Sequence, residues 1–565
     1  MKKKPESYAG YFRPHIGKVL GAFFLSALSS AIAFISTNVL SQFVDQISIA
    51  KSFCPLAILI IIWLICGLSS KLTSFAASRI LLAVQAKVQH KIKWRLLGKL
   101  ANASIESVGK SNPTDLSEKT SEDVNRFLDS IHTIYQEVFS VLLGIAALAY
   151  SAYVSWQIFV IFVISLFSIL VVHFNMKKEM AASQTNARKA SVFAKHFITQ
   201  ILKAFCDIQV QSLTVGIKNH INSILEDEVS ANTKANKVFI NSGLISSILS
   251  LLSQVAFLLL GALLVVNSRL TVANFIALYL YRSYVFGLAD SSLRIIKSKA
   301  QMDAAKDRMD DIFRRKSVKK EVWGYSHLPN PTGNITVRNL CATRGDKTVL
   351  DDLSLELPSG KFIGIVGESG CGKSSLLAVL SKGLSYTGDI LLDGIQLSDL
   401  SEESHRRAIT LAPQDAFIFQ ELTFRENLCL ANPNASDDEI WRCLKRCGAD
   451  AFIHAKGGLD SPSKGLSGGQ RQKLALARLH LRGGKIILLD ESTSALDGEA
   501  QSTIIQTVRQ AANMGHTIIL VAHRVSTLKN ADKILLMDKG RIIAQGTYSE
   551  LYETSEKFRR LADLG

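Results

Sequence analysis

Cysteine is scarce in this chain of 565 residues, and its eight cysteines form no CxxC pair. Their spacing does not match the disulfide frameworks of small secreted domains, so the fold does not require disulfides. Cys443 and Cys447 share one face of an expected helix, but no other cysteine or histidine adjoins them to complete a metal site. We interpret both as small side chains buried in a core.

Acidic residues are also few relative to basic ones: 48 Asp and Glu stand against 65 Lys and Arg, a formal net charge of +17. A basic chain can bind nucleic acid, but there is no zinc-finger, RNA-binding or helix-turn-helix pattern, so we expect no nucleic-acid partner. The positive charges instead crowd residues 2–13, 79–126 and 177–237, next to long apolar runs. This distribution is typical of the cytoplasmic loops of a membrane protein.

A cleavable signal peptide is missing as well, because the first apolar run is too long for a signal-peptide core and has no clear cleavage site. Six apolar runs are long enough to cross a bilayer, and they span residues 16–40, 54–78, 131–155, 156–174, 242–266 and 271–293. An even number of crossings puts both termini on one side, and the basic N-terminus indicates the cytoplasm. The sequence therefore predicts a multi-pass protein of the cytoplasmic membrane, in contact with lipid, with both termini in the cytoplasm.

After the sixth apolar run the sequence becomes mixed and rich in charged residues. This change in composition divides the chain into two domains. Residues 1–316 are expected to form a six-helix membrane domain with helical extensions into the cytoplasm, and residues 317–333 a linker with turn chemistry. In residues 334–565, strand-like and helical segments alternate, which predicts a soluble α/β domain. Its mostly helical middle block, residues 398–483, predicts a helical subdomain.

Arg282 is a charged residue inside the sixth apolar run. A charge at that depth is costly unless it faces a wet cavity or a partner. Two interpretations remain open: an ion pair with Asp290, two helical turns further on, or a contact for an anionic substrate.

The stretch around which the soluble domain is organised is residues 361–384, where a β-branched apolar run leads into a glycine loop and then a helix-like segment. The loop, residues 367–374, reads GESGCGKS. Its glycines let the backbone N–H groups point inward, and the helix start adds its positive dipole end. Lys373 can reach the outer phosphates of a nucleotide, and Ser374 can hold Mg²⁺.

Two neighbouring carboxylates end a second buried strand, residues 486–489. Because the end of such a strand opens beside the nucleotide loop, Asp490 can help to hold Mg²⁺ and Glu491 can orient the attacking water. Ser467, Gly468 and Gly469 begin another helix, which is a second anion site. One ATP does not need two such sites, so we expect a head-to-tail dimer in which each chain supplies this element to the other.

These residues closely resemble an ABC transporter ATPase. Six motifs occur in the family's order, and they resemble Walker A, the Q-loop, the signature, Walker B, the D-loop and the H-switch: GESGCGKSS, the glutamine of APQD, LSGGQRQ, ILLDE, SALD and the histidine of VAHR. The preceding six-helix part is similar to the exporter-type (type IV) membrane domain. The resemblance therefore covers nearly the whole chain and implies a half-transporter, with the type IV membrane fold fused to a P-loop α/β ATPase.

The resemblance also implies roles for individual residues. ATP would contact Gly367, Glu368, Ser369, Gly370, Cys371, Gly372, Lys373, Ser374, Ser375, Arg344 and Val349, and, across the dimer, Ser467, Gly468, Gly469, Gln470 and Asp497. Mg²⁺ would be held by Ser374, Gln414 and Asp490. Glu491 would be the catalytic carboxylate, His523 would sense the γ-phosphate, and Gln414 would link the metal site to the membrane domain. The segments 111–123 and 207–216 would be coupling helices that touch the ATPase domains.

The chain departs from the family pattern in two places. Arg344 stands where the family usually has an aromatic residue that stacks on adenine, although a guanidinium can also stack on a base. The segment before the signature, residues 458–465, is shorter than the exporter pattern and lacks its usual glutamate.

The function that these features predict is ATP-driven export of an amphipathic or peptide- or lipid-like substrate by alternating access. A homodimer is favoured because one chain carries every motif, and a heterodimer with a related half-transporter is the alternative. Import of an anionic metal chelate on the same fold and an ATP-gated channel are the competing functions.

Overall fold

The computed structural model describes residues 8–47, 53–109, 111, 113–314, 318–413, 417–490, 498–522 and 524–563. The chain separates into two compact units, Met1–Gly98 with Pro113–Arg314, and Lys99–Asn112 with Arg315–Gly565. The first unit is helical and the second contains the sheets.

The helical unit is built from long helices that follow the apolar runs. Its helices are α1 (Ala9–Phe12), α2 (Ile16–Ile47), α3 (Cys54–Ala101), α5 (Pro113–Thr120), α6 (Glu122–Val154), α7 (Trp156–Lys203), α8 (Phe205–Val210), α9 (Thr214–Val266) and α10 (Val272–Phe313). Among the described residues, six helices are long and apolar enough to span a membrane, which confirms the predicted fold class. With 48 residues, α3 is about 72 Å long, more than twice the ~30 Å hydrocarbon core, so it extends far beyond the bilayer.

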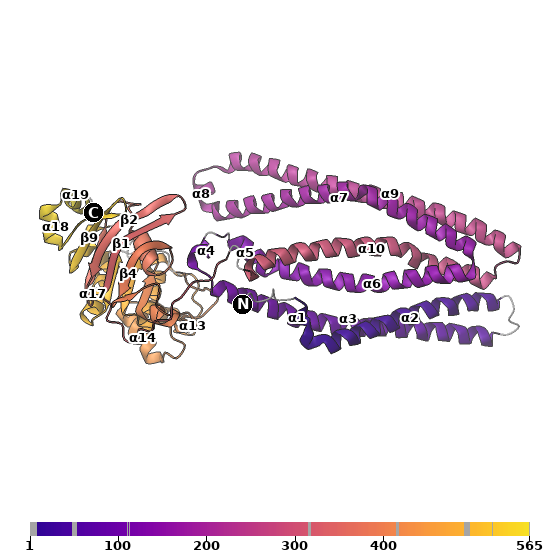
Figure 1. The fold of residues 1–565 in the computed structure, drawn as a ribbon, viewed down its shortest axis with the longest axis horizontal. Helices are drawn as coiled ribbons and strands as arrows, with labels where there is room; N and C mark the ends of the chain where they lie inside the picture. The colour runs from indigo at the N-terminus through magenta and orange to yellow at the C-terminus, as the bar shows by residue number, and fades with distance from the viewer. Residues whose placement is uncertain are drawn as a thin grey trace. The chain divides into compact units, whose positions relative to one another are not determined.

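Among these helices, α6 packs along α10 and α7 along α9, while α2 packs on α10 and is hydrogen-bonded to α3 (Figure 1). In lipid, helices associate through close contact of small residues and through hydrogen bonds. Ser29 and Ser70 each donate a hydrogen bond to the other's backbone carbonyl, at 2.8 and 3.0 Å. A Cβ at Gly144 of α6 would lie 2.3 Å from Leu288 of α10, so a larger residue does not fit there.

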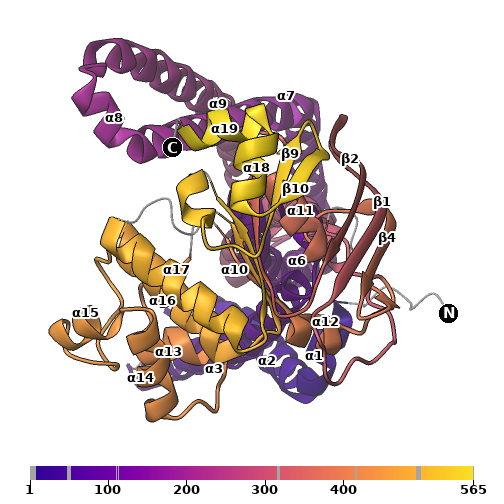
Figure 2. The same ribbon diagram turned by 90° about the vertical axis from the view of Figure 1, so that its left-hand side faces the viewer.

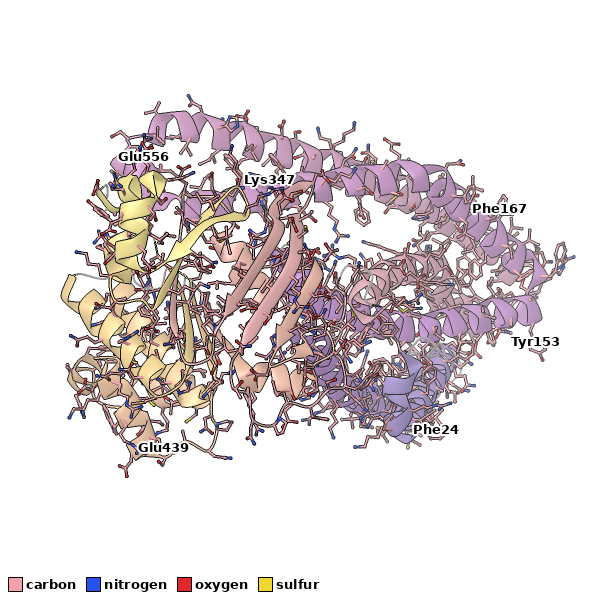
Figure 3. All side chains as sticks on the ribbon, turned by 60° about the vertical axis from the view of Figure 1, so that its left-hand side comes forward. Phe24, Tyr153, Phe167, Lys347, Glu439 and Glu556 are labelled. Carbon is pink, nitrogen blue, oxygen red and sulfur yellow. The ribbon has the colours of Figure 1, made fainter. Side chains whose placement is uncertain are left out.

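Large apolar side chains on the outside of these helices match a lipid environment. The side chains of Tyr153 and Phe167 are 89% and 68% exposed and lie on the outside of α6 and α7 (Figure 3). In water such exposure would be unfavourable, because buried apolar surface is worth about 25 cal/mol per Å². The helical unit is therefore that of a multi-pass membrane protein.

The second unit contains two sheets. An antiparallel sheet has the order β2-β1-β4-β5 and a mixed sheet the order β10-β9-β3-β8-β7-β6 within the described residues. The strands are β1 (Ile335–Arg344), β2 (Lys347–Leu357), β3 (Phe362–Val366), β4 (Tyr386–Leu392), β5 (Ile395–Gln396), β6 (Ile409–Ala412), β7 (Ile486–Asp490), β8 (Thr517–Val521), β9 (Lys533–Asp538) and β10 (Arg541–Gly546). Strands β3 and β8 are buried along their whole length and pair in parallel, as their continuous apolar sequences predict.

The helices of this unit are α4 (Ile105–Gly109), α11 (Lys373–Leu380), α12 (Glu402–Ala408), α13 (Phe424–Cys429), α14 (Asp437–Arg446), α15 (Asp450–Ala455), α16 (Gly468–Arg482), α17 (Gly498–Asn513), α18 (Tyr548–Thr554) and α19 (Glu556–Asp563). Helices α13, α14, α15 and α16 group together (Figure 2), which confirms the helical subdomain. The middle block is not wholly helical, because β6 lies within it and pairs in parallel with β7 at the edge of the sheet. Cys447 is buried in the core as expected, and burial raises the pKa of its thiol to about 12.

The segment after α3 that packs in the second unit lies earlier in the chain than the segment that we predicted. Ser104 donates its backbone N–H to the carbonyl of Lys319 at 2.8 Å, and Glu106 of α4 accepts a hydrogen bond from the backbone N–H of Ser385 at 3.2 Å. The predicted segment, residues 111–123, mostly belongs to the helical unit, because Lys119 of α5 pairs with Asp311 of α10 at 2.7 Å. Ion pairs with distant residues decided the placement of α5, and local sequence does not reveal them.

His405 is a buried imidazole in α12 that carries no charge at neutral pH. It is 4% exposed, its Nε2 lies 3.1 Å from the carbonyl oxygen of Leu380, and burial lowers its pKa to about 4. An unfolded histidine takes up a proton near pH 6.5, whereas the folded one does so only near pH 4.

We expect the stability of the soluble unit to fall as the pH drops from 6.5 toward 4, because His405 then binds a proton in the unfolded state but not in the folded state. The full effect is ~3 kcal/mol. Urea unfolding of the solubilised chain between pH 7.5 and pH 5.5, followed by the fluorescence of Trp323 beside His405, measures the slope. His405→Gln keeps an N–H donor and should make this slope shallower, while His480, whose pKa burial also lowers to about 4, keeps the remainder; an unchanged slope would contradict the assignment.

Candidate nucleotide-binding site

The glycine loop between β3 and α11 is shaped by close contacts that only glycine permits. Gly367 and Gly372 have φ angles of 155° and 110°. A Cβ at Gly367 would lie 2.2 Å from the carbonyl oxygen of Met537, and a Cβ at Gly372 would lie 2.5 Å from that of Val349. The loop therefore needs glycine at both positions, and Val349 borders it directly.

Lys373 is held over this loop. Its side chain is 5% exposed, and its Nζ donates hydrogen bonds to the carbonyl oxygens of Gly367 at 2.8 Å and Glu368 at 3.0 Å. A buried ammonium at a helix start, beside inward-turned backbone, is suited to bind phosphate oxygens. Cys371 lies beside it, and burial raises the pKa of this thiol, so the thiol stays protonated.

Ser374 and Asp490, predicted as metal ligands from distant parts of the chain, lie together. The hydroxyl of Ser374 donates to Oδ1 of Asp490 at 2.9 Å. A hydroxyl and a carboxylate are hard oxygen ligands of the kind that Mg²⁺ prefers in nucleotide sites. The pair is thus suited to a magnesium ion that neutralises phosphate charge beside Lys373. Ser375, the next predicted contact, follows in α11.

Four predicted residues, Glu491, Gln414, His523 and Asp497, lie outside the described residues. In sequence, three of them lie just after parallel strands: Glu491 follows β7 directly, and one residue separates Gln414 from β6 and His523 from β8. With β3, these strands pair in parallel within the mixed sheet, in the order β3-β8-β7-β6. The carboxyl ends of parallel strands share one edge, which is where the phosphate loop begins.

The signature residues start α16 in the helical subdomain. Ser467 caps this helix: its Oγ accepts from the N–H of Gln470 at 3.2 Å, and Oε1 of Gln470 accepts from the N–H of Ser467 at 3.1 Å. Gly468 and Gly469 form the first helical turn, whose N–H groups have no partner within an α-helix. Among the described hydrogen bonds, none joins Ser467, Gly468 or Gly469 to the phosphate loop of the same chain.

Arg344 stands at the end of β1, where the β1–β2 hairpin turns. It is exposed and faces Lys347 across the turn, and Figure 3 shows Lys347 at the hairpin tip. The structure thus leaves the Arg344 side chain free of burial, at the edge of the strand pair that also carries Val349.

The turn after β9 supports the phosphate loop, and the sequence did not predict this contact. The N–H of Gly540 donates to the carbonyl of Cys371 at 2.9 Å, and Gly540 has a φ of 81°. Lys557 of α19 pairs with Asp538 at 2.9 Å and with Glu368 of the loop at 3.6 Å. Asp-Lys-Gly is a sequence typical of a turn, but nothing local links it to a loop more than 160 residues away.

The shortened segment before the signature is fixed to α13 by polar contacts. Arg425 donates to Asp460 at 2.7 Å and also pairs with Asp437, and its hydrogen bonds lower the pKa of both carboxyl groups. Asn427, buried at 1% exposure, donates to Ser463 at 3.0 Å. The segment is therefore held in place without the family's glutamate.

Comparison with known proteins adds matches over most of the chain. The family model described as ABC transporter transmembrane region matches residues 19–288, and the one described as ABC transporter matches residues 350–494. The microcin-J25 export ATP-binding/permease protein of Escherichia coli is 27% identical over 559 residues, which cover 96% of this chain and 95% of that protein.

Further relatives match over shorter parts. The β-(1→2)glucan export ATP-binding/permease protein of Bartonella bacilliformis is 30% identical over 62% of this chain and 59% of its own length. The alpha-hemolysin translocation ATP-binding protein of Escherichia coli is 34% identical over 53% of this chain and 43% of its own length. A bacterial Atm1-family ABC exporter with ATP bound has the same fold, with a TM-score of 0.81 at 18% identity over 98% of this chain and 99% of that one.

Proposed function

Since this chain belongs to the ABC transporters, as a half-transporter with fused membrane and ATPase domains, we propose that two copies form a homodimeric exporter of amphipathic, peptide- or lipid-like substrates in the cytoplasmic membrane. ATP hydrolysis in the soluble domain drives the transport. The observation that carries the proposal is the cluster of Lys373 with the Ser374–Asp490 pair, in a chain with six membrane helices.

Within this proposal, each ATP is held between two chains. Lys373 and the N–H groups of the glycine loop bind the phosphates, and Ser374, Asp490 and Gln414 hold the Mg²⁺ that neutralises phosphate charge. The first turn of α16 in the partner, with Ser467, Gly468, Gly469 and Gln470, closes on the same phosphates, and Asp497 belongs to this interface. Two helix starts and one metal site then surround one nucleotide.

Hydrolysis is assigned to residues at the carboxyl edge of the sheet. Glu491 orients the attacking water, and His523 contacts the γ-phosphate. ATP favours the closed pair of soluble domains and hydrolysis releases it, which gives the membrane helices two states. Arg344 stacks on adenine at the hairpin edge.

The proposed dimer also explains an exposed apolar surface at the cytoplasmic reversal between α7 and α9. Phe205, Val210 and Val215 are 53%, 85% and 74% exposed. This reversal lies far beyond the apolar span of α7, so lipid does not cover it. We assign α8 as the coupling helix that contacts the partner's ATPase domain, while α4 packs in the second unit of its own chain.

Export rather than import is supported by the relatives, whose names state export or translocation of microcin J25, a glucan and hemolysin. Both termini are assigned to the cytoplasm because the ATPase domain must reach cytoplasmic ATP. In inside-out vesicles this domain faces the added ATP, so an exporter moves substrate into the vesicle lumen.

We therefore expect ATP-dependent accumulation of a dansylated Phe-Leu-Phe peptide in inside-out vesicles that contain the protein. The measurement is lumenal fluorescence after rapid filtration, with Lys373→Ala vesicles as the matched control without ATP turnover. An importer would instead empty preloaded inside-out vesicles. An ATP-gated channel would equalise the concentrations and never exceed the outside level. Either result would contradict the proposal.

A further inference from the structure

Arg282 lies at mid-depth of the membrane-spanning part of α10. It follows the first residue of this helix, Val272, by ten positions, which corresponds to about 15 Å along the axis. This is about half the ~30 Å thickness of a hydrocarbon core. A charge there costs several kcal/mol unless a partner or water compensates for it.

The described contacts of Arg282 include no acidic group. Asp290, the partner considered from the sequence, makes no ion pair with it among the described residues, and the nearby Arg294 pairs with Glu137 at 2.6 Å. The guanidinium instead lies 5.7 Å from the ring centre of Tyr279 and 5.5 Å from that of Phe286. Its Nη1 reaches the carbonyl oxygen of Ser250 on α9 at 3.5 Å. The described residues therefore do not contain the ion pair with Asp290 that the sequence left open.

Other polar groups gather around the guanidinium. Nε2 of Gln254 lies 3.4 Å from the hydroxyl of Tyr279, and the Tyr279 side chain is 39% exposed. The ring centre of Phe257 lies 6.2 Å from that of Tyr279, but Phe257 is fully buried in the helix core. A cation, a hydroxyl and an amide thus meet between α9 and α10, bordered by aromatic rings. Among the described residues, no acidic side chain contacts these groups to balance the positive charge of Arg282.

We propose that Arg282 binds a carboxylate of the transported molecule, while Tyr279 and Phe286 hold its apolar part. The inference rests on the proposed export function and narrows the substrates to amphipathic anions. A guanidinium offers two parallel N–H donors that match a carboxylate, and its charge is only partly satisfied by the rings and by one long contact to a carbonyl. The anion supplies the missing charge at a depth where an unpaired cation is costly.

Direct binding to the full-length chain in lipid nanodiscs without nucleotide tests this inference independently of ATP hydrolysis. The probes are dansyl-Phe-Leu-Phe with a free carboxylate and the same peptide with a C-terminal amide, followed by fluorescence anisotropy. A charge-assisted hydrogen bond contributes enough for the acid to bind about tenfold tighter than the amide. Arg282→Gln should remove this preference by weakening the acid alone, and Arg282→Lys should keep part of it.

Arg269→Gln is the matched control, because Arg269 is an exposed cation in the loop between α9 and α10. It should keep the full preference for the acid. Equal binding of the two peptides to the unmodified chain, including no binding of either, would overturn the inference and point to an acid of a second copy as the partner of Arg282. A preference that survives in Arg282→Gln or disappears in Arg269→Gln would overturn it too. If the proposed export function is wrong, ATP-driven accumulation of the peptide in vesicles is lost. The difference in binding between the acid and the amide peptide then remains.

Discussion

Replacing Glu491 with Gln is expected to lower the rate of ATP hydrolysis by about 100-fold or more while ATP stays bound between two copies of the chain. The neutral amide no longer polarises the attacking water, but it has nearly the same shape as the carboxylate. The phosphate contacts of Lys373 and the Ser374–Asp490 pair are unaffected, so closure of the dimer persists. Loss of turnover with retained nucleotide separates a catalytic role from a binding role.

Turnover is measured as phosphate release by the reconstituted protein, and trapping as ATP that remains bound after gel filtration. Glu402→Gln is the matched control, because it neutralises an exposed carboxylate on α12 that pairs only with Arg406 among the described ion pairs. It should hydrolyse ATP at the normal rate. Normal turnover in Glu491→Gln would refute the assignment, and loss of both turnover and trapped ATP would make Glu491 a binding residue instead.

Local patterns predicted most of the fold, because the hydrophobic pattern within each of these segments indicates its structure. The six apolar runs and the buried strands β3, β7 and β8 follow from hydrophobic content. The placement of α4 did not follow, because it depends on the contact of Glu106 with Ser385, 279 positions apart. Strand β6 was also missed, since four residues in a helical block carry too weak a signal.

The same distinction holds for the nucleotide site. Lys373, Ser374 and Asp490 could be predicted to meet because the carboxyl ends of parallel strands share an edge. The support of the loop by Gly540 could not, since only the folded sheet places the β9 turn against Cys371. For Arg282, the sequence showed the cost of the charge but not its neighbours. Only the folded structure shows that the rings of Tyr279 and Phe286 adjoin the guanidinium.

Mixing two inactive variants is expected to restore ATP hydrolysis if each site is shared by two chains. Lys373→Ala damages the phosphate loop, and Gly469→Asp places a carboxylate where the partner's phosphates would approach. Gly469 lies in the first turn of α16 in helical backbone, where an acidic residue favours the helix, so the variant should fold. Each variant alone has two defective sites. A mixed dimer has one site with both defects and one intact site, formed by Lys373 of one chain and the signature of the other.

The test uses two affinity tags, one on each variant, and tandem purification so that only mixed dimers are assayed. Phosphate release should rise well above that of either variant alone. The matched control is a mixture of Lys373→Ala with Glu491→Gln, because both residues belong to the same half of the site. Each site of that dimer carries a defect, so it should stay inactive. Activity in this control, or none in the Lys373→Ala and Gly469→Asp mixture, would contradict a shared site. An unmodified chain that hydrolyses ATP only after a related half-transporter is added would contradict the homodimer, since one chain then lacks part of the site.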